Sequence, residues 1–292
     1  MKTLRTCNPI TTTAYYLIIT GILMFTKNPV FLIMAILGLI AYMTVSEIHL
    51  DRKSVIFYIT FFLILAIINP ITSHKGITVL FVVNDAPITL EAIIYGLVSS
   101  GGIVCILLLF RNFTNIMTRD KLLYVFGKFS QRIALVMSMG IRYVGLLRER
   151  SQKIKMTQRA LGLYSEDNIF SKIRSDLRVF SILVTWSLEN GIITADSMAA
   201  RGYGLRKRTF FSNHHFDRKD FILLIVTLFF SIATILGMNM GGANFSCYPN
   251  IKMAAVTPVS LITYCSFGLL AMLPAILERL EIIKWKYLQS KI

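Results

Sequence analysis

The sequence has 292 residues, of which 55% are hydrophobic and 16% are charged, and it carries a formal net charge of +16. A mean hydropathy of +0.64 and so few charges exclude an ordinary soluble domain, in which about 25% of residues are charged. The positive charge raises the question of nucleic acid, but the sequence has no zinc-finger spacing and no RNA-binding signature, so we expect no nucleic-acid partner.

Six apolar stretches follow one another along the chain, interrupted by helix-breaking or charged residues. They cover residues 9–25, 30–45, 55–68, 90–110, 221–238 and 254–277. A membrane span needs about 20 mostly apolar residues, so this pattern predicts an all-α polytopic membrane protein with about six transmembrane helices. Proline disfavours the helical conformation of the residue before it, so Asn8-Pro9, Asn28-Pro29 and Asn69-Pro70 predict helix boundaries.

The distribution of Lys and Arg predicts that both termini are cytoplasmic. With the N-terminus inside, only Lys27, Lys75 and Lys252 lie in outer loops, and the other 28 of the 31 Lys and Arg residues lie inside or at the inner interface. The positive-inside rule favours this orientation. We expect the first stretch to be a retained helix rather than a signal peptide, because no small-residue cleavage site follows it.

Residues 111–220 form one long basic insertion, with 20 Lys and Arg against 9 Asp and Glu, a net charge of +11. We therefore divide the chain into N-terminal transmembrane helices 1–4 (1–110), a cytoplasmic domain with two long helices (111–220) and C-terminal transmembrane helices 5–6 (221–292). Anionic lipid headgroups attract such basic segments, so we expect contact with the bilayer.

Two long helices are predicted inside this insertion. Residues 134–158 change from apolar to charged, and Arg142 argues against a further membrane span because a charge in hydrocarbon is costly. Residues 169–201 carry an apolar stripe with spacings of three and four residues, which predicts a helix that lies along the membrane or packs on other helices. The stripe consists of Ile173, Leu177, Phe180, Val184, Leu188, Ile192, Ala195 and Ala199.

Both predicted helices end in a similar way. The first ends with Arg159-Ala160-Leu161-Gly162 and the second with Ala200-Arg201-Gly202. Glycine just after a helix suits a left-handed cap, and a basic residue there suits the helix dipole, so a single such ending needs no functional explanation. Two of them in one basic insertion predict a pair of projecting tips.

At these residues the sequence resembles a known family, the transmembrane T component of energy-coupling-factor (ECF) transporters, which includes the cobalt-transport membrane protein (CbiQ-like) group. The resemblance covers nearly the whole chain and is most specific at ENGIITADSMAARGYG, which ends at Gly204 and is followed by Arg208-Thr209. It also includes the first two Asn-Pro pairs, ITLEAIIYGL and SMGIRYVGLLRERSQKIKMTQRALG.

The resemblance implies a coupling subunit in the plasma membrane of a prokaryote. In this family two coupling helices end in Ala-Arg-Gly-type motifs, which sit in grooves of two ABC ATPase subunits (A components), where the arginine meets acidic side chains. Another face holds a substrate-binding membrane subunit (S component), and ATP-driven motion of the ATPases drives uptake of a vitamin or metal ion.

The family motif is carried over residue by residue. The second motif matches at Ala200, Arg201 and Gly202. The first matches at Ala160 and Gly162 but has Leu161 in place of the motif arginine, and Arg159 is a candidate replacement.

Two other classes of function remain open. The chain lacks a phosphate-binding loop, and its four cysteines form no CxxC pair, so we expect no ATP hydrolysis, no catalytic residue, no cofactor and no metal site. A multi-pass membrane enzyme would need clustered carboxylates, for which Glu189 and Asp196 are the candidates. A secondary transporter would need polar residues within the spans or inverted repeats.

Overall fold

The chain is almost entirely helical, as the sequence predicts. The structure, a computed structural model, describes residues 6–46, 51–72, 76–83, 86–164, 168–203, 216–247, 252–253 and 257–290. The helices are α1 (Pro9–Phe25), α2 (Pro29–Val45), α3 (Arg52–Thr72), α4 (Leu90–Ile116), α5 (Arg119–Phe129), α6 (Gln131–Ala160), α7 (Ile169–Ala200), α8 (Arg218–Asn239) and α9 (Pro258–Gln289). Two short antiparallel pairs join β1 (Val79–Val83) to β2 (Ala86–Thr89) and β3 (Phe245–Ser246) to β4 (Lys252–Met253).

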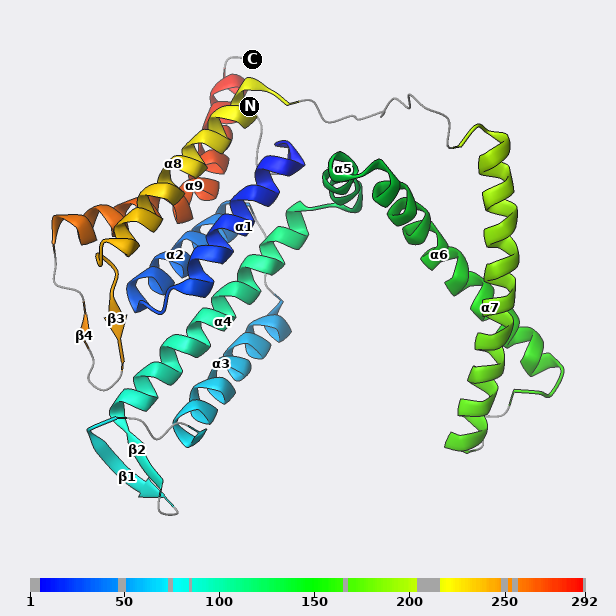
Figure 1. Ribbon diagram of the computed structural model, residues 1–292, viewed down its shortest axis with the longest axis horizontal. Helices are drawn as coiled ribbons and strands as arrows, with labels where there is room; N and C mark the ends of the chain where they lie inside the picture. Colours follow the sequence, from blue (N-terminus) through cyan, green and yellow to red (C-terminus); the bar gives the residue numbers. More distant parts are fainter. Residues whose placement is uncertain are drawn as a thin grey trace. The chain divides into compact units, whose positions relative to one another are not determined.

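The chain forms two compact units. One contains Met1–Lys121 together with His214–Ile292, and the other contains Leu122–Asn213. Helices α1 to α4, α8 and α9 belong to the first unit, and α6 and α7 belong to the second (Figure 1). The functional division of the chain at residues 110 and 220 stays a prediction.

The first unit contains the apolar helices. Among the described residues, α3, α4, α8 and α9 are long and apolar enough to cross a bilayer, judged by length and composition. Helices α1 and α2 are also apolar but have 17 residues each, which is the lower end of the range of about 17–25 for a span. The protein is thus an all-α polytopic membrane protein, and each of the six apolar stretches contributes one helix of this unit.

Local sequence explains why α1 and α2 begin where they do. Asn8 accepts a hydrogen bond from the backbone N–H of Ile10 at 3.1 Å, and Asn28 accepts one from Val30 at 2.9 Å. In both helices the proline that follows the asparagine occupies the first turn, where its missing N–H costs no hydrogen bond. The first two predicted Asn-Pro boundaries are therefore confirmed.

The third Asn-Pro boundary is wrong. Helix α3 continues through Pro70 to Thr72, so proline lies inside its last turn. The carbonyl of Ala66, to which residue 70 of a regular helix would donate, faces Gly96 of α4: a Cβ atom added at Gly96 would lie 2.9 Å from this oxygen and 3.3 Å from Pro70 Cδ. The turn of α3 that contains Pro70 thus packs closely on a helix that has no side chain at this point, and its backbone stays helical although proline donates no hydrogen bond to Ala66.

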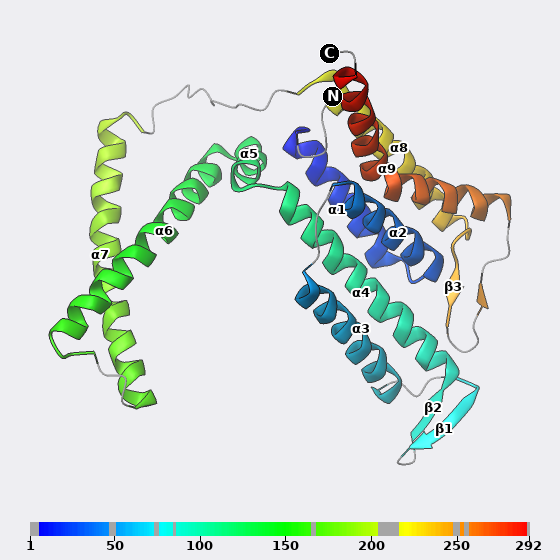
Figure 2. The same cartoon turned by 180° about the vertical axis from the view of Figure 1, so that it is seen from behind.

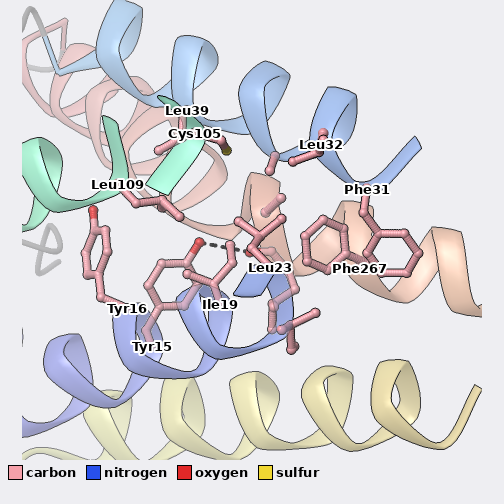
Figure 3. Close-up of a cluster of buried hydrophobic side chains, with 14 of the residues drawn as sticks. Tyr15, Tyr16, Ile19, Leu23, Phe31, Leu32, Leu39, Cys105, Leu109 and Phe267 are labelled. Carbon is pink, nitrogen blue, oxygen red and sulfur yellow. Dashed lines mark hydrogen bonds between the residues drawn. The ribbon is translucent and has the colours of Figure 1, made fainter. Parts of the chain in front are cut away.

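The core of the first unit lies between α1, α2, α4 and α9. The rings of Phe31 and Phe267 are 4.6 Å apart between centroids (Figure 3), and the Tyr15 hydroxyl donates to the backbone oxygen of Leu270 at 3.1 Å. Helix α2 approaches α9 closely at Gly38, where an added Cβ atom would lie 2.5 Å from the backbone oxygen of Ala271. Small residues at such crossings let membrane helices pack backbone against backbone.

Candidate functional site

Helices α6 and α7 form a crossed, antiparallel pair within the second unit (Figure 1 and Figure 2). The Tyr143 hydroxyl lies 2.9 Å from Thr194 Oγ1, and Lys155 Nζ lies 2.8 Å from Asp176 Oδ1. Residues nearer the C-terminus of α6 thus contact residues nearer the N-terminus of α7, so the two helices run in opposite directions. The two helix C-termini therefore lie at opposite ends of the pair, separated by about the length of a 30-residue helix, or roughly 45 Å.

The apolar stripe of α7 does not face α6. Its large side chains are exposed; Leu177, Phe180 and Leu188, for example, are 61%, 64% and 66% exposed. The residues that meet α6 lie on another face and are mixed in character, among them Asp176 and Thr194. The pair therefore leaves a long apolar surface available for a membrane or another protein.

The C-terminus of α6 ends in a Schellman motif. Leu161 is the C-cap residue, and Gly162 follows it with φ +66°. The Gly162 N–H donates to the Arg159 carbonyl at 3.0 Å, and the Leu163 N–H donates to the Gln158 carbonyl at 2.9 Å. These two bonds satisfy carbonyl groups that a helix end otherwise leaves without partners.

The C-terminus of α7 is built in the same way. Arg201 is the C-cap residue, and Gly202 follows it with φ +77°. The Gly202 N–H donates to the Ala199 carbonyl at 3.0 Å, and the Tyr203 N–H donates to the Met198 carbonyl at 2.9 Å. The structure thus places Ala200, Arg201 and Gly202 together at one exposed helix end. Gly204 and Arg208-Thr209, which follow this end in the chain, lie outside the described residues.

The common construction aligns the two ends residue by residue. Ala160 corresponds to Ala200, and Leu161 corresponds to Arg201. Leu161 is 63% exposed, and Arg201 is exposed. The first end therefore presents an apolar side chain at the position where the second end presents a guanidinium group.

Arg159 lies two positions before this cap and has a different environment. Its guanidinium carbon lies 5.1 Å from the centroid of the Tyr164 ring, a cation–π contact with the residue that follows the turn. The Lys155 ammonium approaches the same ring at 5.6 Å. Arg159 is thus engaged with its own helix end rather than placed at the cap position.

The first helix end is connected to α7 by a polar latch, which consists of Lys155, Leu163, Tyr164, Asp176 and Arg178. Asp176 Oδ1 accepts hydrogen bonds from the Tyr164 hydroxyl at 2.9 Å and from Lys155 Nζ at 2.8 Å, and Arg178 Nη1 donates to the Leu163 carbonyl at 3.2 Å. Sequence reasoning missed this latch, because its members are separated by a turn and no periodic pattern links them.

The latch shifts the pKa values of its charged members. The hydrogen bond from Lys155, with a second one from Tyr164, holds the pKa of Asp176 below its ordinary value. The same hydrogen bond raises the pKa of Lys155. Both shifts favour the ionised forms that the ion pair between Lys155 and Asp176 requires.

Other candidate chemistry is dispersed. Glu189 and Asp196 are both exposed on α7. Across the part of the chain that the structure describes, no three His, Cys, Asp or Glu side chains gather in a way that could hold a metal ion. Cys7, Cys105 and Cys247 are buried, and Cys265 is exposed.

Comparison with known proteins places the chain in a family. The model of the CbiQ family, described as cobalt transport protein, matches residues 2–210. The chain is similar to the energy-coupling factor transporter transmembrane protein EcfT of Bacillus selenitireducens, with 31% identity over 115 residues, which are 39% of this chain and 43% of the relative. EcfT 1 of Listeria monocytogenes is 31% identical over 106 residues (36% and 40%), and EcfT of Streptococcus thermophilus is 30% identical over 110 residues (37% and 42%). The chain thus matches less than half of the length of these curated relatives. Since the family match extends over well more than half of the sequence and includes both helix ends, the chain belongs to the CbiQ family of cobalt transport proteins.

Proposed function

We propose that the chain is the transmembrane coupling subunit, or T component, of an ECF-type importer. Two ABC ATPase subunits bind the ends of α6 and α7, and a substrate-binding membrane subunit binds another face of the protein. Motion driven by ATP passes through the two helices to the substrate-binding subunit, which takes up a vitamin or metal ion. The chain itself hydrolyses no ATP. The names of the similar proteins and the description of the family support this proposal.

The observation that carries the proposal is the pair of matching helix ends at opposite ends of one crossed pair. A rigid antiparallel pair with a contact point at each extremity can touch two subunits at once and respond to a change in their separation. Gly162 and Gly202 turn the chain sharply back, so that the C-cap side chain stands at the extremity of each helix.

At the second end, Arg201 is the residue that meets the ATPase. Its guanidinium group offers five donors in a planar fork, which suits a carboxylate in an acidic groove. The adjacent Gly202 has no side chain that would hinder close approach. When such a contact is desolvated, removing one partner costs about 2–5 kcal/mol.

At the first end, Leu161 rather than Arg159 makes the main contact. Leu161 occupies the cap position and is exposed, as is Leu163, which is 49% exposed, so this end offers an apolar surface. Arg159 instead stacks on Tyr164. The two ATPase sites therefore differ in chemistry, one apolar and one acidic.

The proposed topology has both termini in the cytosol. Within the first unit, the backbone N–H of Asn8 donates to Asp220 Oδ1 at 3.0 Å, so α1 and α8 begin at the same end of this unit. This contact supports the same side of the membrane for the N-terminus and for residue 220, as the positive-inside rule predicts. Lys75, one of the three predicted outer lysines, lies outside the described residues.

The test is co-purification of the full chain with the two ATPase subunits and the substrate-binding subunit from the native cell. Arg201→Glu places a negative charge against an acidic groove, so we expect loss of ATPase binding and of uptake while the protein remains in the membrane. Arg148→Glu, at an exposed position within α6, is the matched charge reversal and should retain the complex. Normal uptake and full ATPase retention by the Arg201→Glu protein would contradict the coupling role.

A further inference from the structure

A small hollow opens where α6 and α7 cross. It has a volume of about 130 Å³ and is lined by Met139, Arg142, Tyr143, Leu146, Asn190 and Thr194. In bulk liquid, this volume would contain about four water molecules. The hollow lies between the first half of α6 and the C-terminal third of α7, where Thr194 precedes the C-cap residue Arg201 by seven residues, about 10 Å along the helix axis. The coupling role proposed above does not use it.

The polar groups that line the hollow differ in how many of their donor and acceptor atoms already have partners within the helix pair. Thr194 Oγ1 donates to the Asn190 carbonyl at 2.7 Å, and the Tyr143 hydroxyl lies 2.9 Å from that Thr194 oxygen. The Asn190 amide nitrogen donates to the Trp186 carbonyl at 3.0 Å, which leaves its second N–H. These contacts hold the hydroxyl and amide groups in place.

Arg142 is the one charged residue among the six that line the hollow. None of the six is acidic, so the hollow contains no carboxylate to neutralise the guanidinium group. The guanidinium group and the second Asn190 N–H form a set of donors that suits an anion with several oxygens, whereas the Tyr143 and Thr194 hydroxyl groups already donate within the helix pair. Phosphate is such an anion, since arginine binds it through two parallel hydrogen bonds.

The surroundings of the hollow favour a lipid as the source of this phosphate. Helix α6 carries seven Lys and Arg residues against one Glu, a net charge of +6. Next to the lining residues in sequence, Val144 is 69% exposed and Ile193 is 60% exposed. Basic side chains beside exposed apolar ones are typical of helices that lie at the headgroup level of an anionic membrane.

We propose that the hollow at the crossing of α6 and α7 binds the phosphate group of an anionic phospholipid. Arg142 provides the charge and the forked hydrogen bonds, and Asn190 provides a further donor. Met139 and Leu146 provide apolar contact for the glycerol and upper acyl carbons. One lipid molecule then bridges the two helices at their crossing point and holds the pair at the membrane surface.

Lipid titration of the purified full chain tests this proposal. The chain in detergent is titrated with phosphatidylglycerol and, separately, with phosphatidylcholine, and bound lipids are counted by native mass spectrometry. We expect one tight phosphatidylglycerol molecule per chain and weaker binding of phosphatidylcholine, in which a positive choline offsets the phosphate charge. Arg142→Gln should weaken the tight binding by about tenfold, as expected when a charge-assisted bidentate contact is lost.

Arg148→Gln is the matched control, because it removes the same charge from the same helix without lining the hollow. It lies six residues further on, about 9 Å along the helix axis, which is beyond the screening length of about 8 Å at physiological salt. Its affinity for phosphatidylglycerol should change less than about twofold. Unchanged helicity of both variants by circular dichroism checks that the pair still folds.

Three results would overturn the proposal. Equal weakening in the two variants would mean diffuse attraction to a basic helix rather than a site. Displacement of the lipid by millimolar inorganic phosphate would assign the hollow to free phosphate instead. Unchanged lipid binding in Arg142→Gln, together with lost co-purification of a membrane partner, would assign Arg142 to a protein contact.

Discussion

Leu161 and Arg201 occupy the same position in two helix ends of the same construction. Each is the C-cap residue of its helix, and each precedes a glycine with a positive φ. The backbone hydrogen bonds that residues 161–163 donate correspond to those that residues 201–203 donate. The backbone therefore presents both side chains alike, and their chemistry alone distinguishes what the two ends can bind.

For the first helix end, we expect Leu161→Arg to be harmful and Arg159→Glu to be mild. A guanidinium group at the position of Leu161 would have to be desolvated in an apolar groove, and burying such a charge without a partner costs several kcal/mol. A pull-down of the ATPase subunits with each full-length variant measures the effect. If Leu161→Arg binds normally and Arg159→Glu does not, then Arg159 replaces the motif arginine and the apolar contact proposed for this end is wrong.

For the second helix end, Gly202→Ala should destabilise the cap. A residue with a Cβ atom pays about 1–2 kcal/mol to adopt the left-handed conformation that Gly202 has at φ +77°. Gly191→Ala is the control, because an added Cβ atom there has open space inside the same helix and should stabilise it by roughly 0.5–1 kcal/mol. Hydrogen exchange of the peptide that covers residues 198–203 should become faster in the first variant only. Similar exchange in both variants would mean that the cap does not limit the opening of this end.

The latch at the first end should respond to acid but not to moderate alkali. Because the pKa of Asp176 is lower in the folded chain than the unfolded value of about 3.9, its stabilisation is fully present above that value and is lost as pH falls through the lowered pKa. The raised pKa of Lys155 means that its contribution is present below about pH 10.4 and is lost only as pH rises through that raised pKa.

Asp176→Asn is the variant that tests this pH dependence. The melting temperature of wild type should exceed that of Asp176→Asn by a constant amount from pH 5 to 9, and the difference should shrink below about pH 4. Glu149→Gln, which breaks only the exposed pair of Glu149 with Lys153 within α6, should have little effect. A difference that changes near pH 7 would point to a group other than this pair.

Within the membrane unit, Gly38→Ala should disrupt the packing of α2 on α9. The added methyl group would lie 2.5 Å from the backbone oxygen of Ala271, so the helices must move apart, at a cost of about 1–3 kcal/mol. Gly21→Ala adds the same group in α1, where it meets no atom within 4 Å. The melting temperature in detergent should fall for Gly38→Ala and stay unchanged or rise for Gly21→Ala. Equal values would show that α2 and α9 have room to adjust.

Local chemistry by itself determined much of this protein. Runs of apolar residues produced a helix for each predicted stretch, and the prolines after Asn8 and Asn28 set where α1 and α2 begin, since caps depend on neighbouring residues only. Gly162 and Gly202 ended α6 and α7 for the same reason. The exposed position of Arg201 at a helix end follows from these local signals.

Tertiary structure decided what local signals leave undetermined. Helix α3 continues past Pro70 to Thr72, and the turn that contains Pro70 packs closely on Gly96 of α4, a contact that the sequence around Pro70 does not contain. The stripe of α7 is regular in sequence, yet the face with Asp176 and Thr194 packs on α6, because hydrogen bonds to Lys155 and Tyr143 orient the pair. The latch and the hollow at Arg142 likewise arise only when residues far apart in the chain meet, since the energy of such contacts depends on distances that no local pattern encodes.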